Sequence, residues 1–155
     1  MENCMKLTVP AISENEPFVR DAVAAFCVRL DPTLDQLSDI KTAVSEAVTN
    51  CIVHAYAGGE GEIEVECAAC DGALHIRISD SGRGIEDVAR ALEPFFTTLE
   101  GDERSGMGFT IMQTFMSEFS VRSSPGEGTV VTMKKQISPA VRREDMRGKV
   151  RDAHG

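Results

Sequence analysis

Residues 63–78 read "IEVECAACDGALHIRI", and this short stretch decides the fold. Apolar residues alternate with other residues on both sides of Asp71-Gly72, a dipeptide typical of two-residue hairpin turns. The pattern therefore predicts two antiparallel strands that are neighbours in one sheet. Their core-facing residues are Ile63, Val65, Cys67, Ala69, Leu74, Ile76 and Ile78.

The chain before this hairpin favours a strand followed by a helix. Residues 5–10, "MKLTVP", suit a first strand. Ser13 followed by Glu16 is a capping-box pattern, which is typical of a helix N-terminus. The helix predicted from there has an apolar stripe made of Val19, Val23, Phe26 and Leu30.

A second helix is predicted from Asp31 to about Tyr56, because aspartate suits an N-cap and Pro32 suits the first helical position. At about 100° per residue its side chains separate into two faces. The apolar face holds Leu37, Ile40, Val44, Val48, Cys51 and Ala55. The opposite face holds Thr42, Glu46, Thr49, Asn50 and His54. We expect the apolar face to pack on the sheet and the polar face to line a pocket.

After the hairpin the pattern predicts a short helix near residues 86–92 and a polar, mobile loop in "EPFFTTLEGDERSGMGF", residues 93–109. A helix then begins at Gly108, and strands follow near residues 119–123 and 129–135. Together these elements predict an α+β fold, a two-layer sandwich in which helices cover one face of a mixed, mostly antiparallel sheet. We expect one domain, residues 1–137, followed by a basic and flexible tail, residues 138–155.

Composition argues against several classes of function. The 155 residues carry a net charge of −9, which disfavours a protein that grips nucleic-acid phosphates. No apolar run approaches the ~20 residues of a membrane span, and the N-terminus lacks a secretory pattern, so we expect a cytoplasmic address. Cys67 and Cys70 form a lone C-x-x-C without a second pair, and we expect reduced thiols there in place of a zinc site.

Three separate segments carry groups that suit a magnesium-nucleotide site. Such a site needs an oxygen ligand for the metal, backbone N–H groups around phosphates and a group that reads the base. Asn50 offers an amide oxygen to the metal, and "RSGMGF" (104–109) offers backbone N–H groups before a helix. Asp80, which opens "DSGRG" (80–84), is able to accept a hydrogen bond from an exocyclic amine. The sequence contains no P-loop motif.

Two charged residues suit phosphoryl transfer in such a site. Glu46, one helical turn before Asn50, is placed to accept a proton from an incoming hydroxyl group. Arg104 is placed to stabilise the charge on the transferring phosphoryl group, or it pairs with its neighbours Asp102 or Glu103.

Five segments resemble the nucleotide-binding boxes of the GHKL superfamily, which includes histidine kinases, gyrase B and the MutL proteins and has the Bergerat ATP-binding fold. They are "SEAVTN" (45–50), "DSGRG" (80–84), "PFFTT" (94–98), "ERSGMGF" (103–109) and "SSPGEGT" (123–129). Within this superfamily, "LDPTLDQLSDIKTAVSEAVTN" (30–50) resembles the anti-sigma F factors of sporulating bacteria. The resemblance covers about residues 5–136.

The resemblance implies a set of site residues. Glu46 matches a general base that acts on a serine of an anti-anti-sigma protein, Asn50 matches a Mg²⁺ ligand, and Arg20 matches a partner-docking arginine, although it also suits an ordinary surface position. Asp80 and Thr129 match an adenine-binding pair, and Gly84, Gly106 and Gly108 match positions where the backbone approaches the nucleotide. The implied ATP-binding set is Asn50, His54, Asp80, Gly82, Gly84, Thr97, Thr98, Ser105, Gly106, Met107, Gly108, Phe109 and Thr129.

The resemblance also implies a function. A homodimer holds a sigma factor of the sigma F type while ATP is bound, and as a protein serine kinase it phosphorylates its anti-anti-sigma partner. A switch kinase for a stress-type sigma factor and a non-catalytic, ATP-dependent binding module are the alternatives. The catalytic half of a histidine kinase is disfavoured, because none of the three histidines (His54, His75 and His154) lies on an upstream dimerisation helix.

Two features depart from the family pattern. The loop after His54, "AYAGGEGE", is short, and the tail beyond Ile137 is longer than the family needs. The strand expected near the N-terminus is a candidate dimer edge, because an edge strand has unpaired backbone groups.

Overall fold

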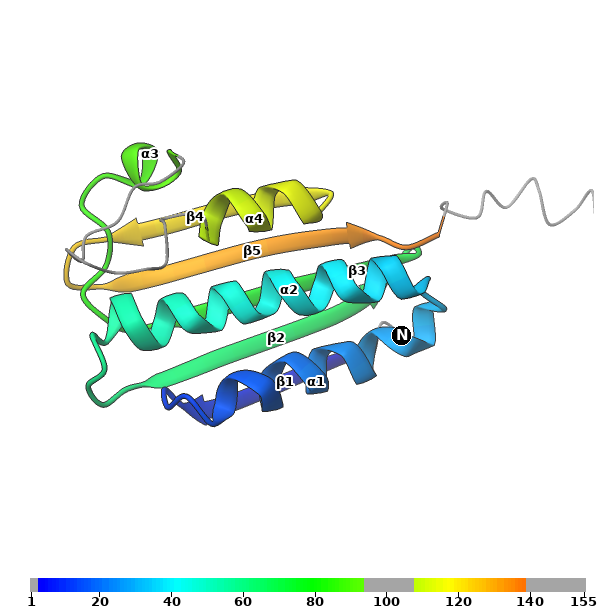
Figure 1. Ribbon diagram of the computed structural model, residues 1–155, viewed down its shortest axis with the longest axis horizontal. Coiled ribbons are helices and arrows are strands. Elements are labelled where there is room, and N and C mark those ends of the chain that lie inside the picture. The colour runs from blue at the N-terminus through cyan, green and yellow to red at the C-terminus, as the bar shows by residue number, and fades with distance from the viewer. Residues whose placement is uncertain (1–2, 94–107, 139–155) are drawn as a thin grey trace, which may run out of the picture.

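The computed structural model of the protein describes residues 3–93 and 108–138 as two layers (Figure 1). Helices α1, α2 and α4 cover one face of a five-stranded sheet, so the predicted two-layer α+β class is confirmed. The elements in chain order are β1 (Asn3–Pro10), α1 (Asn15–Cys27), the 3-10 turn η1 (Val28–Leu30), α2 (Leu34–Asn50), the π-helical turn η2 (Cys51–Ala55), β2 (Glu62–Cys70), β3 (Ala73–Asp80), α3 (Val88–Ala91), α4 (Gly108–Phe115), β4 (Glu118–Ser124) and β5 (Gly128–Gln136).

The strand order in the sheet is β1-β2-β3-β5-β4, and all four pairings are antiparallel. The mixed sheet expected from the sequence is thus purely antiparallel in the described residues. The predicted hairpin joins β2 to β3, with Cys70 opposite Ala73. Asp71 and Gly72 both have positive φ, 51° and 73°, which a type I′ turn requires at its two central positions.

The starts of α1 and α2 differ from the sequence predictions. Asp31 adopts a left-handed conformation and donates its N–H to the Val28 carbonyl, so it ends η1 and does not cap α2. Thr33 is the N-cap instead, and it exchanges two hydrogen bonds with Gln36 in a capping box. Because this reciprocal pair satisfies two backbone N–H groups, it defines the helix start better than the single Asp-Pro signal.

The capping box predicted at the start of α1 is absent. Glu14 is the N-cap of α1 and makes no side-chain cap hydrogen bond. The backbone N–H of Glu16 bonds to the Ser13 carbonyl at 3.2 Å, and the Asn15 side chain bonds to the Pro10 carbonyl at 2.8 Å. These contacts form a tight turn that carries the chain from β1 onto the sheet face.

The core forms between the sheet and the apolar face of α2. Ile40, Val44 and Val48 are fully buried, as predicted, and Cys51 is 4% exposed. Leu37 and Ala55, near the two ends of the helical segment, are only partly buried. The predicted core face of the hairpin is confirmed for Ile63, Val65, Cys67, Leu74, Ile76 and Ile78, whereas Ala69 is partly buried next to the turn. The position of α2 over the centre of the sheet is therefore fixed by apolar burial.

The second half of the chain follows the predicted order. The helix predicted near residues 86–92 is the single turn α3, whose N-cap Asp87 accepts a hydrogen bond from the Arg90 N–H at 3.1 Å. The helix predicted from Gly108 and the two final strands are confirmed. Most of the predicted loop 93–109 and the tail lie outside the described residues. In the part of the chain that the structure describes, no helix is both long and apolar enough to cross a membrane.

The capping box gives a stability prediction. Thr33→Ala removes the side-chain acceptor for the Gln36 N–H, so we expect the free energy of unfolding to fall by about 1 kcal/mol in urea titrations. Thr42→Ala is the matched control in the same helix. The Thr42 hydroxyl donates to the Ser38 carbonyl inside α2, a bond that adds little, so its loss should change stability by less than about 0.5 kcal/mol. Equal losses in both variants would show that Thr33 acts only as a helix residue.

Candidate functional site

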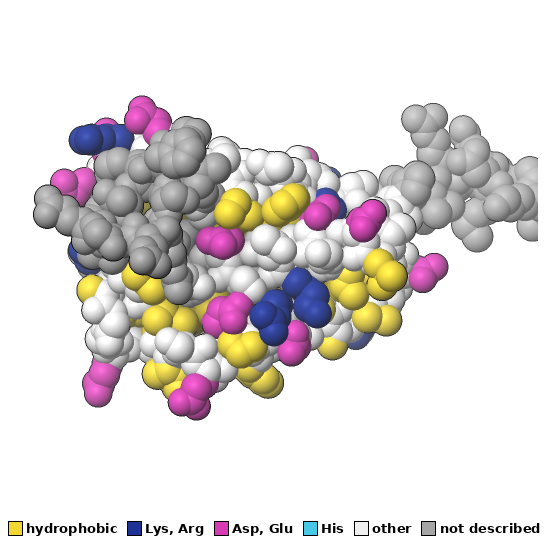
Figure 2. Space-filling view, in the orientation of Figure 1, with side chains coloured by type: hydrophobic (Ala, Val, Ile, Leu, Met, Phe, Trp, Pro, Cys, Tyr) yellow, Lys and Arg dark blue, Asp and Glu magenta, His cyan; other side chains and the backbone are white. Residues whose placement is uncertain are grey.

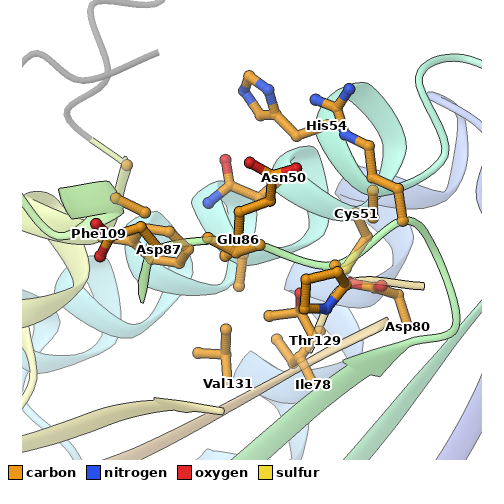
Figure 3. A pocket seen from close by; sticks show the side chains of 18 of the residues that line it. Asn50, Cys51, His54, Ile78, Asp80, Glu86, Asp87, Phe109, Thr129 and Val131 are labelled. Atoms are coloured by element: carbon orange, nitrogen blue, oxygen red, sulfur yellow. The ribbon is translucent and has the colours of Figure 1, made fainter. Parts of the chain in front are cut away.

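A pocket of about 500 Å³ lies at the C-terminal end of α2 (Figure 3). The helix side of the pocket carries Asn50 and His54, and the sheet side carries Ile78, Asp80, Thr129 and Val131. Further walls come from the loop that follows β3, from helix α3 and from the start of α4. The full lining is Ala47, Asn50, Cys51, His54, Ala55, Ile78, Asp80, Arg83, Gly84, Ile85, Glu86, Asp87, Arg90, Ala91, Gly108, Phe109, Pro125, Thr129 and Val131.

The turn η2 shapes the helix side of the pocket. After Asn50 the helix widens into a π-turn in which the Tyr56 N–H bonds to the Cys51 carbonyl at 3.1 Å. The Ala55 carbonyl accepts from the Arg83 N–H at 3.0 Å, and the Tyr56 hydroxyl accepts from the Ser81 N–H at 2.8 Å. The loop after β3 is therefore attached to the end of α2, and π-turns of this kind are frequent at functional sites.

Asp80 is a partly buried carboxylate at the end of β3. Its Oδ1 accepts a hydrogen bond from the Gly82 N–H at 3.0 Å. Loss of contact with water raises the pKa of the Asp80 carboxyl above its usual value, and the hydrogen bond from Gly82 acts in the opposite direction. A partly buried carboxylate with one backbone donor keeps acceptor sites for a further hydrogen bond.

Cys51 is the thiol beside Asp80. Burial, followed by the charge of Asp80 and a hydrogen bond to it, raises the pKa of the Cys51 thiol well above its usual value. The thiol therefore stays protonated. The sequence assigned Cys51 to the core face of α2; the residue is indeed buried, but it also lines the pocket.

Thr129 faces Asp80 across the β3–β5 pairing and is 9% exposed. Its hydroxyl lies 2.8 Å from the Ser123 hydroxyl, which also accepts from the Ile85 N–H at 2.8 Å and donates to the Gly128 carbonyl at 2.9 Å. Since Ser123 has only one proton and gives it to Gly128, Thr129 is the donor in their shared bond. Two acceptors, the Thr129 hydroxyl oxygen and the Asp80 carboxylate, thus remain on the sheet side of the pocket.

The glycines of "DSGRG" are required by the fold itself. A Cβ atom at Gly82 would lie 2.4 Å from the Ala55 carbonyl oxygen. Gly84 has a φ of 74°, and a Cβ there would lie 2.0 Å from the Ser124 carbonyl oxygen. Both positions allow the loop after β3 to pack against neighbouring backbone. Gly84 also lines the pocket, so its approach to a nucleotide stays a prediction.

Glu46 and Asn50 meet the start of α4. A Cβ atom at Gly108 would lie 3.3 Å from Glu46 Oε2, 3.3 Å from Asn50 Nδ2 and 3.4 Å from Asn50 Oδ1. The N-terminus of α4 therefore lies directly against the polar face of α2, and the predicted convergence of these two segments is observed. Of the same predicted face, Asn50 and His54 line the pocket, whereas Thr42, Glu46 and Thr49 do not.

The structure places the other predicted site residues as follows. Gly108 and Phe109 line the pocket, whereas Arg20 lies on α1, which contributes no residue to it. The Arg20 Nε donates to Asp21 Oδ1 at 3.3 Å, and the Arg20 side chain is 34% exposed. Six further predicted residues lie outside the described residues: Thr97, Thr98, Arg104, Ser105, Gly106 and Met107.

Sequence reasoning missed several residues of the pocket. Cys51 carries no motif signal, and the core face of α2 to which it belongs borders the pocket at this end of the helix. Ser123 does not line the pocket but contacts the Thr129 hydroxyl, because β4 and β5 pair these two residues. Three missed residues of the lining lie inside recognised motifs: Ala47 in "SEAVTN", Arg83 in "DSGRG" and Pro125 in "SSPGEGT".

Comparisons with known proteins place this geometry in context. Residues 9–135 match the family described as Histidine kinase-like ATPase domain. The chain is 53% identical over 135 residues to the anti-sigma F factor of Caldanaerobacter subterraneus, and this alignment covers 87% of this chain and 94% of the relative. It is 52% identical over 138 residues to the anti-sigma F factor of a Clostridium botulinum strain, and this alignment covers 88% of this chain and 96% of the relative.

The fold also resembles solved structures. The RsbU and RsbW domains of a Mycobacterium tuberculosis protein superpose with a TM-score of 0.64 at 22% identity, over 89% of this chain and 34% of that chain. At this identity the likeness supports the fold and not the chemistry of the pocket.

Asp80 gives a prediction on pH dependence. Its pKa is higher in the folded than in the unfolded protein, so the free energy of unfolding should fall as pH rises from the usual carboxyl range through the raised value. Asp80→Asn removes this titration. We expect the nucleotide-free variant to lose that part of the pH dependence and to be at least as stable as the wild type at neutral pH, measured by urea unfolding across pH.

Asp71→Asn is the control for Asp80→Asn. Asp71 is exposed in the hairpin turn, where asparagine is equally well accommodated, so the wild-type pH profile should persist. An Asp80→Asn protein with the wild-type pH profile would show that the Asp80 carboxylate does not govern the pH dependence of stability.

Proposed function

Because this chain belongs to the histidine kinase-like ATPase domain family, and within it to the anti-sigma F factors, we propose that it binds ATP and inhibits a sigma factor of the sigma F type. We further propose that it is an ATP-dependent protein serine kinase whose substrate is an anti-anti-sigma factor. In this proposal the protein acts as a homodimer during sporulation, with residues 1–137 as the kinase domain.

The observation that carries this proposal is the meeting of three segments around one pocket. Asn50 on α2, Asp80 after β3 and Gly108 at the start of α4 are far apart in sequence and line the same cavity. Its volume of about 500 Å³ is within the range of small-molecule and cofactor sites. The lining combines apolar side chains with a few polar groups, as expected for a site that holds a base and orients phosphates.

The residues present fit ATP and Mg²⁺. The acceptors of Asp80 and Thr129 suit an exocyclic amine, and the Asn50 amide oxygen suits a hard cation that keeps most of its waters and phosphate ligands. The N-terminus of α4 offers backbone N–H groups to phosphates. The predicted contribution of residues 104–107 lies outside the described residues. When bound, magnesium-ATP supplies the phosphoryl group.

The kinase assignment depends on Glu46. The Glu46 carboxylate and the Asn50 amide both lie next to Gly108 at the start of α4. From there Glu46 orients a serine hydroxyl and takes its proton, an effect worth roughly 10²–10⁴ in rate. In this proposal Arg104 stabilises the transferring phosphoryl group, and Arg20 on α1 contacts the protein partner.

Co-precipitation with ATP or ADP tests the proposed function as a whole. The tagged protein is incubated with purified sigma factor of the F type and magnesium, with either nucleotide. We expect ATP to retain several-fold more sigma factor than ADP. Equal recovery with both nucleotides would refute the ATP-dependent inhibitor, and recovery only of a stress-type sigma factor would favour the alternative switch kinase.

Glu46→Ala separates catalysis from binding. The change removes a proton acceptor but leaves the Asn50 amide in place, so phosphorylation of the anti-anti-sigma protein should fall at least about a hundredfold while ATP and sigma factor still bind. Radiolabelled phosphate transfer and calorimetry measure the two effects. Loss of ATP binding to the same degree would assign Glu46 to the nucleotide site, and full retention of transfer would remove it from catalysis.

Asn50→Ala is the contrasting variant on the same helix face. Removal of the amide oxygen should weaken ATP binding in the presence of magnesium by about tenfold and have little effect in its absence. Unchanged affinity in both conditions would show that Asn50 does not serve the metal.

A further inference from the structure

Lys135 is a charged residue on the helix-covered face of the sheet, where the pattern of β5 calls for an apolar side chain. Val131 and Met133, at the two preceding positions of the same face, are 5% and 1% exposed in the core. The Lys135 side chain is only 14% exposed. Because removal of an ammonium group from water is costly without partners, a lysine is retained here for the contacts it makes.

The Lys135 ammonium group has partners on two helices. Its Nζ lies 3.0 Å from Asp39 Oδ2 on α2, in a partly buried ion pair. The same Nζ donates a hydrogen bond to the Phe115 carbonyl, at the C-terminal end of α4. A cation is favourable at that end of a helix, because the last carbonyls have no partner within the helix. One side chain of β5 thus joins α2 to the end of α4.

Backbone hydrogen bonds also attach the end of α4 to β5. The Ser117 N–H donates to the Lys134 carbonyl at 2.8 Å, and the Gln136 N–H donates to the Ser117 hydroxyl at 2.9 Å. Neither bond uses the Lys135 side chain, so both persist when that side chain is replaced. Loss of Lys135 therefore removes the link from α4 to α2 and leaves the helix end on its strand.

The helices α4 and α2 pack side by side and run in opposite directions (Figure 1). The Gly108 end of α4 lies next to Glu46, and the Phe115 end is joined to Asp39 through Lys135. Gly108 and Phe115 are seven positions apart, as are Asp39 and Glu46, so two spans of about 10 Å lie next to each other. Seven residues make almost two helical turns, and Asp39 and Glu46 therefore share one side of α2.

We propose that Lys135 is a positioning residue for ATP, which fixes the direction of α4 on α2 and so holds the start of α4 where its backbone N–H groups meet the phosphates. This inference rests on the proposed ATP site. Gly108 and Phe109 of α4 line the pocket, whereas the acceptors proposed for the base, Asp80 and Thr129, belong to the sheet. A change in the direction of α4 therefore affects the phosphate side of the site and not the base side.

The length of α4 explains how a distant contact acts on the phosphates. The helix spans about 10 Å from Phe115 to Gly108, so a rotation of about 10° at the Phe115 end moves the Gly108 end by about 2 Å. Displacements of about 1 Å in a site that positions a substrate are enough to reduce its function strongly. A link at the far end of the helix is therefore sufficient to control its N-terminus.

Amide hydrogen exchange without nucleotide tests the first part of the proposal. Lys135→Met keeps a long side chain and removes the charge and the donors. We expect the amides of α4 to exchange about tenfold faster than in the wild type, while those of β2 and β3 stay within about twofold. Equal acceleration in both regions would show a loss of overall stability and would overturn the positioning role. Unchanged exchange in α4 would overturn it as well.

Titration with ATP and with adenosine, both in the presence of magnesium, tests the second part. Lys135→Met should weaken ATP binding by about fivefold and leave adenosine, which has no phosphates, within about twofold of wild type. Lys135→Arg keeps the charge and its donors and should restore the wild-type affinity for ATP. The proposal is overturned if Lys135→Met weakens both ligands equally or binds ATP like the wild type.

Lys134→Met is the matched control on the same strand. The Lys134 side chain lies on the opposite face of β5, with Nζ 3.7 Å from Glu118 Oε1 on β4. The change removes a lysine and an ion pair but no link between α2 and α4. We expect wild-type exchange in α4 and wild-type affinity for both ligands. An effect as large as that of Lys135→Met would assign the result to loss of charge on β5 and overturn the proposal.

Two further results keep the test decisive. If Lys135→Met does not fold, Asp39→Asn removes the charge of the partner and leaves the bond from Lys135 to the Phe115 carbonyl. It should then weaken ATP binding by about threefold and not adenosine binding. If the wild-type protein binds neither ligand, the proposed ATP site itself fails. Hydrogen exchange still shows whether Lys135 fixes α4, so the two failures are distinguishable.

Discussion

The packing of α2 on the sheet is the constraint on which the rest of the structure depends. Ile40, Val44 and Val48 are fully buried against it, and each contributes roughly 1.5–3 kcal/mol through removal of its side chain from water. With that face fixed, helix geometry requires Glu46 and Asn50 to point elsewhere, because they lie at other angles around the same axis. The start of α4 packs at that second face, and the pocket opens beyond it. Apolar burial thus positions polar side chains that contribute little to stability themselves.

The second constraint is a partly buried carboxylate that the fold keeps available. Loss of contact with water raises the pKa of Asp80, and the hydrogen bond from the Gly82 N–H offsets part of that cost. A pocket that required only stability would place an apolar or amide side chain there. Retaining the carboxylate exchanges some stability of the nucleotide-free protein for an acceptor that a ligand amine is able to satisfy. Such exchanges between stability and function are common at binding sites.

Sequence reasoning succeeded where the signal is local and repeated. The hairpin at Asp71-Gly72 and the two faces of α2 follow from short-range periodicity, and both are observed. It failed where two local signals compete, as at Asp31, which ends η1 while Thr33 caps α2. It also failed at Cys51, which was assigned to the core face of α2 and also lines the pocket at the end of the helix. The Ser123–Thr129 contact depends on strand register, which no single segment encodes. The motifs identified Asp80, Asn50 and Gly108 as pocket residues. Only the structure shows why glycine is required at positions 82 and 84, because a side chain there would collide with neighbouring backbone.

α2 also links the pocket to a second surface. On its other flank it packs against α1, where Lys41 of α2 and Arg20 of α1 both lie near Asp21, at 3.9 and 3.3 Å. Figure 2 shows basic and acidic side chains mixed over this pair of helices. Exposed ion pairs of this kind contribute about 0–1 kcal/mol, so their exchange for contacts with a charged partner would cost the fold little. The sheet side of the pocket, in contrast, contains the buried side chains of Ile78, Thr129 and Val131. One helix therefore contributes to a partly buried pocket at its C-terminal end and to an exposed charged surface along its flank, an arrangement that suits the proposed binding of a nucleotide and a protein partner.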